Sequence, residues 1–278
     1  MGPPINREEA LGRLRDVISS RKIIVGAGAG IGLSATHLEK GGVDLIGVYN
    51  SGRFRMAGRG SLAGLTPYGD ANGIVLEMAR EIIPIIENVG IFAGVCATDP
   101  FRTMPQFLQQ LQDLGFCGVQ NFPTVGLIDG TFRENLEETG MSYSLEVDMI
   151  RQAHEMGMLT CPYVFTIEDA EMMARAGADV IVVHMGLTTS GSIGAETSIT
   201  LDDCVKRIQE CRDAAVKVNR DVIVLCHGGP IATADDAQHV LEKTTGVHGF
   251  FGASSMERLP TETAIEEVAK GFKEVAAK

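Results

Sequence analysis

Short apolar runs rich in β-branched residues recur along the chain, each followed by a polar or glycine-rich turn and then by a segment of helical period. The eight runs span residues 22–26, 43–49, 89–95, 116–121, 158–164, 178–185, 221–227 and 247–253. Nearly all are continuously apolar rather than alternating, which is typical of strands buried on both faces of a parallel sheet. Amphipathic segments at 73–89, 104–115, 145–157, 166–177 and 201–218 predict helices between them.

Eight strands alternating with helices predict an α/β fold, a (β/α)8 TIM barrel that takes up residues 1–278 as a single domain. Residues 1–20 add an extra N-terminal helical segment, NREEALGRLRDVIS, which we expect to cap the bottom of the barrel. A doubly wound open sheet is the alternative, and it would need a dinucleotide fingerprint after the first strand. In 23-IIVGAGAGIGLSATHLEKGG-42, however, Ile31 or Leu33 takes the place of the last glycine.

The chain is acidic, with a formal net charge of −12 at pH 7. Such a surface argues against nucleic acid as a partner, while local arginines still suit a small anionic metabolite. No apolar run reaches membrane-spanning length and the first residues lack the apolar region of a signal peptide, so we expect a cytoplasmic protein without a membrane partner. The six cysteines form no C-x-x-C pair, which predicts reduced thiols, although a single reactive thiol, Cys96 or Cys226, remains an alternative.

We expect the ligand at the carboxyl ends of the strands, where the loops of such a barrel form its active site. In the first loop, Gly28 and Gly30 would let backbone amides approach an anion, unless these glycines only relieve crowding beside the next helix. The second loop, 50-NSGRFRMAGRGSLAGLTPYGDAN-72, is long, and its Arg53 and Arg55 carry guanidinium groups that suit a carboxylate or phosphate. Its alternative role is a solvated or subunit-contacting loop.

Two histidines end neighbouring strands of the predicted barrel. His184 and His227 could meet over the barrel mouth and move protons, with Asp99 or Glu257 as a partner. They could also share a metal, or be hydrogen-bonded structural residues. No H-x-H pair accompanies them, so metal ligands remain unknown and no cofactor is assigned, while one Mg²⁺ held by a carboxylate, waters and substrate is left open. No lysine ends a strand, which argues against Schiff-base chemistry.

Small residues and hydroxyls follow the last two predicted strands. The loops 227–233 and 252–262 have the composition of a barrel phosphate site, although ordinary turn and cap chemistry would explain them too. Over all the strand ends, the expected substrate-binding residues are Gly28, Gly30, Asn50, Ser51, Arg53, Arg55, Asn121, Tyr163, Gly228, Gly229, Ser254 and Ser255.

Several stretches of this chain resemble one TIM-barrel family. They are VGAGAGIGLSA, 47-GVYNSGRFRMAGRGSLAGLTPYGDAN-72, 94-GVCATDP-100, 120-QNFPTVGLIDG-130, 182-VVHMGLT-188 and 226-CHGGPI-231. Together they are similar to the phosphoenolpyruvate hydrolase-like family, also labelled phosphonopyruvate hydrolase, and to the C-terminal half of a plant antiviral resistance protein. The resemblance implies a barrel, a homo-oligomer and a link to the phosphoenolpyruvate mutase and isocitrate lyase superfamily. Well-characterised members of that superfamily use acidic magnesium ligands, and this chain has no clear Asp-Asp-Glu set at strands three to five.

These observations lead to two hypotheses on function. The first is a hydrolase or lyase acting on a small phosphorylated or carboxylated keto-acid, similar to phosphoenolpyruvate or phosphonopyruvate. The alternative is a barrel that binds a metabolite or a protein without turnover, as a sensor or adaptor in signalling. Mutation of the two histidines would separate them, because loss of turnover with ligand still bound indicates the enzyme.

Overall fold

The computed structural model describes residues 5–277 and shows a parallel sheet curled into a (β/α)8 barrel. The strands run in the order β5-β4-β3-β2-β1-β9-β8-β7-β6. Their bounds are β1 Ile24–Gly28, β2 Leu45–Val48, β3 Gly90–Gly94, β4 Gly118–Gln120, β5 Leu159–Thr160, β6 Tyr163–Val164, β7 Val180–His184, β8 Ile223–His227 and β9 Gly249–Gly252. All eight predicted strands are therefore present, and the open-sheet alternative was wrong.

The two edge strands of that order, β5 and β6, are halves of the one predicted strand 158–164. They are separated by Cys161 and Pro162, and proline has no N–H to donate to a sheet ladder. The backbone nevertheless stays in register, because Cys161 N donates to Val119 O at 2.9 Å and Val182 N donates to Pro162 O at 2.9 Å. The barrel thus closes through this interrupted strand.

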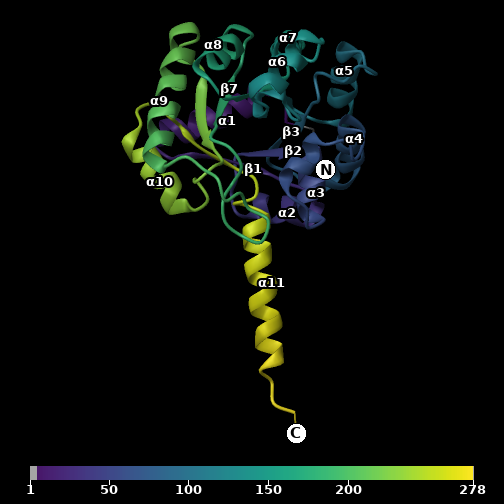
Figure 1. The fold of residues 1–278 in the computed structure, drawn as a ribbon, viewed down its shortest axis with the longest axis vertical. Helices are drawn as coiled ribbons and strands as arrows, with labels where there is room; N and C mark the ends of the chain where they lie inside the picture. The colour runs from purple at the N-terminus through teal and green to yellow at the C-terminus, as the bar shows by residue number, and fades with distance from the viewer. Residues whose placement is uncertain (1–4, 278) are drawn as a thin grey trace.

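Most of the helices lie on the outside of the barrel (Figure 1). The helices described are α1 Arg7–Ser19, α2 Gly32–Lys40, α3 Asn50–Met56, α4 Ala71–Ile82, α5 Met104–Leu114, α6 Gly130–Glu138, α7 Tyr143–Glu155, α8 Ile167–Arg175, α9 Leu201–Val218, α10 Ala234–Lys243 and α11 Arg258–Lys273, with 3-10 turns η1 Ser61–Leu65, η2 Ile83–Ile85 and η3 Val125–Leu127. The predicted helix 73–89 ends early, because Pro84 gives a 3-10 turn. The predicted loop 50–72 opens with α3, and α6 was not predicted. None of the helices described is long and apolar enough to cross a membrane.

Apolar side chains form one layer between sheet and helices and a second inside the barrel. The inner layer includes the rings of Phe92 and Phe251, whose centroids lie 5.8 Å apart. Gly26 and Gly47 make room for them, since a Cβ at either position would come within 2.7 Å of a ring carbon. Residues of α1, including Leu14, pack against the same inner layer.

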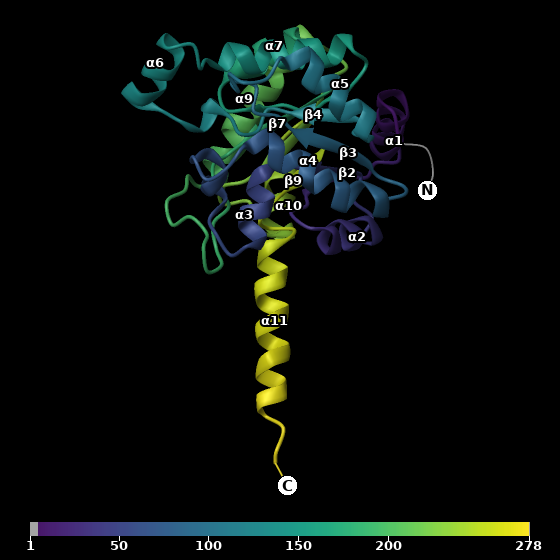
Figure 2. The ribbon, with the colours of Figure 1, turned by 90° about the vertical axis from the view of Figure 1, so that its right-hand side faces the viewer.

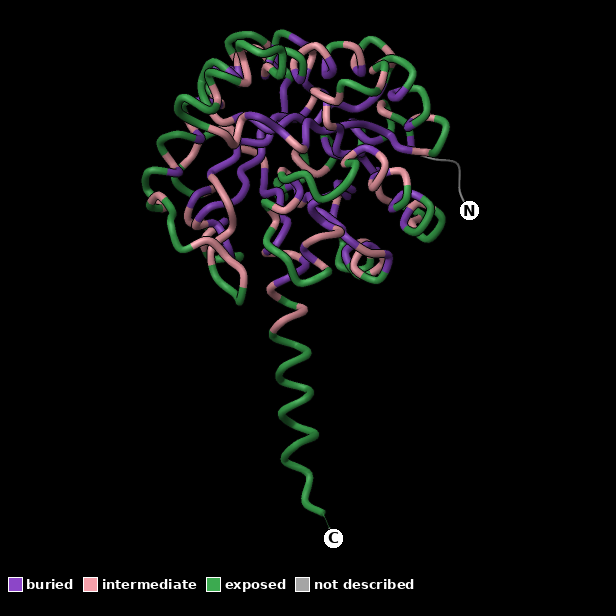
Figure 3. The backbone as a smooth tube through the Cα atoms, turned by 45° about the vertical axis from the view of Figure 1, so that its right-hand side comes forward, coloured by how far each residue is buried: buried purple, intermediate pink, exposed green. Residues whose placement is uncertain are grey.

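The last helix leaves the barrel. Figures 1 and 2 show α11 projecting away from the body of the molecule, and from Thr263 to Ala277 every residue is exposed (Figure 3). Its apolar residues Ile265, Val268 and Phe272 are 60 to 76% exposed. A helix of this length is marginal in water without a partner surface.

Candidate active site

A small pocket with a mixed polar and apolar lining lies at the carboxyl ends of the strands, in the mouth of the barrel. It encloses about 30 Å³, which is room for roughly two water-sized groups. Its lining comes from the ends of six strands or the loops after them: Tyr49, Ser51, Arg55, Ser61, Leu62, Phe122, Leu127, Tyr163, His184, Gly186, Leu187, Thr188, His227, Ala253 and Ser254. A second pocket of about 130 Å³ adjoins it and shares Ser61, Leu62, Leu187, Thr188 and Ser254.

The two histidines meet in this pocket and carry opposite tautomers. Their ring centroids are 4.6 Å apart, and each packs within about 5 Å of the Tyr163 ring. His184 Nδ1 accepts a hydrogen bond from Gly186 N at 3.0 Å, which assigns its proton to Nε2. His227 Nδ1 lies 2.7 Å from Phe251 O and must donate to it, which leaves a lone pair on Nε2.

Both histidines are neutral at physiological pH. Burial lowers the pKa of His227 to about 4. Burial, together with the nearby His227, lowers the pKa of His184 well below its usual value. The pair therefore presents one N–H donor and one basic nitrogen without any net charge.

A buried ion pair holds Arg55 in the pocket wall. Its Nε donates to Glu257 Oε2 at 2.8 Å, and its Nη2 donates to the same carboxylate and to Gly28 O. The other oxygen of Glu257 accepts from Gly30 N at 2.7 Å. Arg55 Nη1 and the hydroxyl of Tyr49 are both buried, and neither has a hydrogen-bond partner among residues 5–277. Gly28 leaves space for that hydroxyl, because a Cβ there would lie 2.1 Å from it.

A second buried carboxylate, Glu146 of α7, supports Tyr163 from behind. Glu146 accepts hydrogen bonds from Asn121 Nδ2 at 2.6 Å, from Thr124 Oγ1 at 2.7 Å and from Val125 N at 2.8 Å. Asn121 in turn accepts from Tyr163 N at 2.7 Å. Burial raises the pKa of Glu146 to about 7. These hydrogen bonds hold Tyr163 in place, and the rings of both histidines pack against it.

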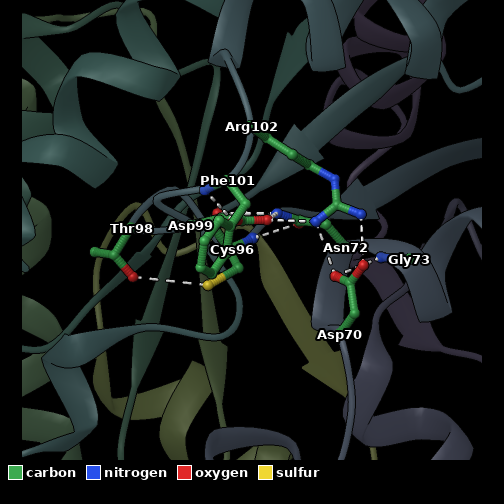
Figure 4. A network of polar contacts seen from close by, with 8 residues as sticks. All are labelled: Asp70, Asn72, Gly73, Cys96, Thr98, Asp99, Phe101 and Arg102. Carbon is green, nitrogen blue, oxygen red and sulfur yellow. Dashed lines mark hydrogen bonds and ion pairs between the residues drawn. The ribbon is translucent and has the colours of Figure 1, made fainter.

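Asp99 lies in a separate network on the β3 side of the mouth (Figure 4). It accepts from Asn72 Nδ2 at 2.9 Å and from Phe101 N at 2.9 Å, and it pairs with Arg102. Arg102 also pairs with Asp70. The same figure shows Cys96 beside this network, and burial raises the pKa of its thiol, which disfavours the reactive thiolate. All six cysteines are free.

The residues expected from the sequence divide into two groups. Ser51, Arg55, Tyr163, His184, His227 and Ser254 line the pocket, whereas Gly28, Gly30, Asn50, Arg53, Asp99, Asn121, Gly228, Gly229, Ser255 and Glu257 do not. Several residues of the second group support the loops that carry the pocket lining. Asn50 donates to Gly64 O and so holds η1 in place. Gly228 and Gly229 take positive φ angles of 76° and 59°. Gly229 N then donates to Gly186 O, which ties the loops after β7 and β8 together.

Sequence reasoning missed Tyr49, Ser61 and Glu146. Glu146 carried a usable signal, because it lies on the same helical face as the apolar positions Met149, Ile150 and Ala153. A carboxylate on a buried face needs hydrogen-bond donors, and its presence there indicates a polar site nearby.

The barrel carries a pocket with polar side chains at the carboxyl ends of its strands, and the comparisons agree with the fold. The chain belongs to the phosphoenolpyruvate hydrolase-like family, whose model matches residues 9–275. It is 63% identical over 266 residues to the ToMV susceptible protein tm-1(GCR26) of Solanum lycopersicum and 62% identical over 270 residues to the ToMV resistance protein Tm-1(GCR237) of the same plant. These matches cover 96 and 97% of this chain but only 35 and 36% of the relatives, so the chain spans about a third of their length.

Solved structures share the fold at low identity. A phosphoenolpyruvate phosphomutase from Streptomyces platensis subsp. rosaceus matches with a TM-score of 0.61 and 16% identity, covering 96% of this chain and 92% of that one. A phosphonopyruvate hydrolase solved with oxalate and Mg²⁺ matches with a TM-score of 0.55 and 15% identity, covering 95% and 87%. The recognised family and the barrel fold are thereby confirmed.

The described residues form no site that would hold Mg²⁺ through protein ligands alone, and one ion held by a carboxylate, waters and substrate stays a prediction. The carboxylates Asp99, Glu146 and Glu257 each accept hydrogen bonds from two or more donors, as described above. Among residues 5–277 no group of three His, Cys, Asp or Glu side chains could hold a metal.

Proposed function

We propose that this protein is a hydrolase or lyase acting on a small keto-acid, with the pocket in the barrel mouth as its active site. The observation that supports this most is the pair of buried, neutral histidines of opposite tautomer beside the Arg55 guanidinium. A donor and a base at this spacing are the groups needed to move a proton next to an oxygen on which negative charge develops.

In the proposed reaction, His227 Nε2 takes a proton from a C–H or O–H group of the substrate or from a water molecule. His184 Nε2–H, Tyr49 Oη and Arg55 Nη1 donate to the oxygens on which charge develops. Burial raises the pKa of Tyr49, so its hydroxyl remains a donor throughout the physiological range. Glu257 keeps the guanidinium oriented and does not itself transfer the proton.

Turnover is tested by phosphorus NMR with phosphonopyruvate and with phosphoenolpyruvate, and by proton NMR with oxaloacetate, each with MgCl₂ and with EDTA. We expect product from at least one of these acids, with a rate that H227N lowers by about 100-fold or more, which is the usual size of a general-base effect. The matched control is H239N, which removes a half-buried histidine on the outer helix α10. An unreactive wild-type protein, or equal rates in H227N and H239N, would refute the proposal.

A second candidate is a barrel that binds a small acid without converting it. It is favoured by relatives whose names refer to virus susceptibility and resistance rather than to a reaction. Saturation-transfer NMR with pyruvate decides between the two, because binding with no turnover of any acid would support this candidate.

We also propose that a second copy of the chain covers α11. Ile265, Val268, Phe272 and Val275 follow a helical spacing of three and four residues along one side of α11 and the segment after it. An apolar pocket of about 550 Å³ lies at the base of the helix, against α2. Light scattering after size-exclusion chromatography should give a dimer or larger for the wild type. The variant V268D/F272D should give a monomer, and K270D, on the same helix, should not.

A further inference from the structure

The pocket offers hydrogen-bond donors but no free negative charge. The charges of Arg55 and Glu257 cancel each other, since both side chains are at most 1% exposed and are directly paired. The two histidines are neutral, and the buried Tyr49 keeps its proton. Two of the donors, Arg55 Nη1 and Tyr49 Oη, have no partner in the described part of the chain although both are buried. Buried donors without partners are costly, and such groups are expected to face a ligand.

We infer that the pocket binds the carboxylate of a monoanionic acid directly, through Tyr49, Arg55 and His184, without a divalent cation. The inference builds on the proposed function and names the group that this site recognises. A carboxylate adds one negative charge to a neutral, buried site, whereas a phosphoryl dianion adds two, and the cost of burying charge without a counter-charge is higher for the dianion.

The size of the site agrees with a short acid. The inner space of about 30 Å³ suits the carboxylate, and the adjoining pocket of about 130 Å³ offers room for a few carbon atoms. Leu62, Leu187 and Ile193 give the second pocket its apolar walls. A 2-oxo acid with a short aliphatic chain therefore fits both parts.

Calorimetry on the full chain tests the inference with pyruvate and methylphosphonate at pH 8, in EDTA and then in MgCl₂. We expect pyruvate to bind with the same affinity, within about twofold, in both buffers. Methylphosphonate, which is mostly a dianion at this pH, should bind at least about tenfold more weakly. Pyruvate binding that disappears in EDTA, or tighter binding of methylphosphonate, would overturn the inference, and so would the absence of pyruvate binding in both buffers.

The variant Y49F separates ligand binding from folding. The Tyr49 hydroxyl makes no hydrogen bond to residues 5–277, so its removal should leave the urea midpoint unchanged or raise it. Pyruvate affinity should nevertheless fall by about tenfold, the usual effect of losing one hydrogen bond to a charged group. The control Y68F removes a hydroxyl from an exposed tyrosine and should change neither quantity. Unchanged affinity in Y49F, or a fall in affinity matched by a lower urea midpoint, contradicts the assignment.

The binding tests of this inference and the turnover tests of the proposed function can fail independently. Pyruvate binding in EDTA with no turnover of any acid leaves this inference standing and refutes the enzyme. Turnover of an acid together with pyruvate binding that disappears in EDTA supports the enzyme and refutes this inference.

Discussion

Replacing His227 by asparagine should change how the stability of the protein depends on pH. Burial lowers the pKa of His227 from 6.5 to about 4. The unfolded chain therefore binds the proton first as the pH falls, so the free energy of unfolding decreases through the window between these two values. From pH 7.5 to pH 5 this decrease is about 2 kcal/mol for the single histidine.

Glu146 acts in the opposite direction over nearly the same window. Burial raises its pKa from 4.5 to about 7. As the pH rises, Glu146 loses its proton in the unfolded chain before it does so in the folded protein. Glu146 therefore lowers the free energy of unfolding by about 2 kcal/mol more at pH 7.5 than at pH 5. The two effects largely cancel in the wild-type protein, and only single variants reveal them.

The assay is urea unfolding followed by far-UV circular dichroism, since the chain has no tryptophan. Protein concentration is held constant because self-association would shift the midpoint. The stability of H227N relative to wild type should be about 2 kcal/mol higher at pH 5 than at pH 7.5, since the asparagine amide can still donate to Phe251 O and does not titrate. E146Q should show the opposite trend. A difference between H227N and wild type that is the same at both pH values would refute the argument that His227 is buried in its neutral form.

Two further predictions concern the wall of the pocket. R55M and E257Q should each lower the free energy of unfolding by about 3–5 kcal/mol, because each leaves a buried charge without its partner, and the double variant should cost less than the sum in a urea-denaturation cycle. G28A should weaken pyruvate binding at least about tenfold in calorimetry, because its Cβ would displace the Tyr49 hydroxyl, whereas G12A, with nothing within 4 Å, should leave binding unchanged and stabilise α1 by about 0.5–1 kcal/mol.

The barrel was predictable because its strands are buried on both faces, so that continuous apolar runs mark them individually. The features of the fold that the apolar pattern did not reveal depend on single residues. Pro162 interrupts the fifth strand, and the polar residues of α3 gave no periodic signal in a segment that resembles a long loop. The projection of α11 away from the barrel could not be predicted either, because its apolar residues have the spacing of an ordinary barrel helix.

The site was predictable only in part, for reasons of side-chain direction. Strand ends indicated His184, His227 and Tyr163, since any barrel brings such residues to one mouth. Arg53 and Arg55 looked equivalent in sequence. Only the turn of α3 directs Arg55 into the pocket, while Arg53 does not line it. Tyr49 was counted within an apolar strand, although its hydroxyl belongs to the polar site.

The pairing of Arg55 with Glu257 has a consequence for the order in which the chain is made. The two residues are 202 positions apart, so during synthesis the guanidinium emerges long before the carboxylate that neutralises it. A growing chain that has completed most of its strands still carries this arginine without a counter-charge, and it cannot bury it at low cost. The pocket is therefore among the last parts of the molecule to assemble, and nascent chains that stop before residue 257 cannot complete it.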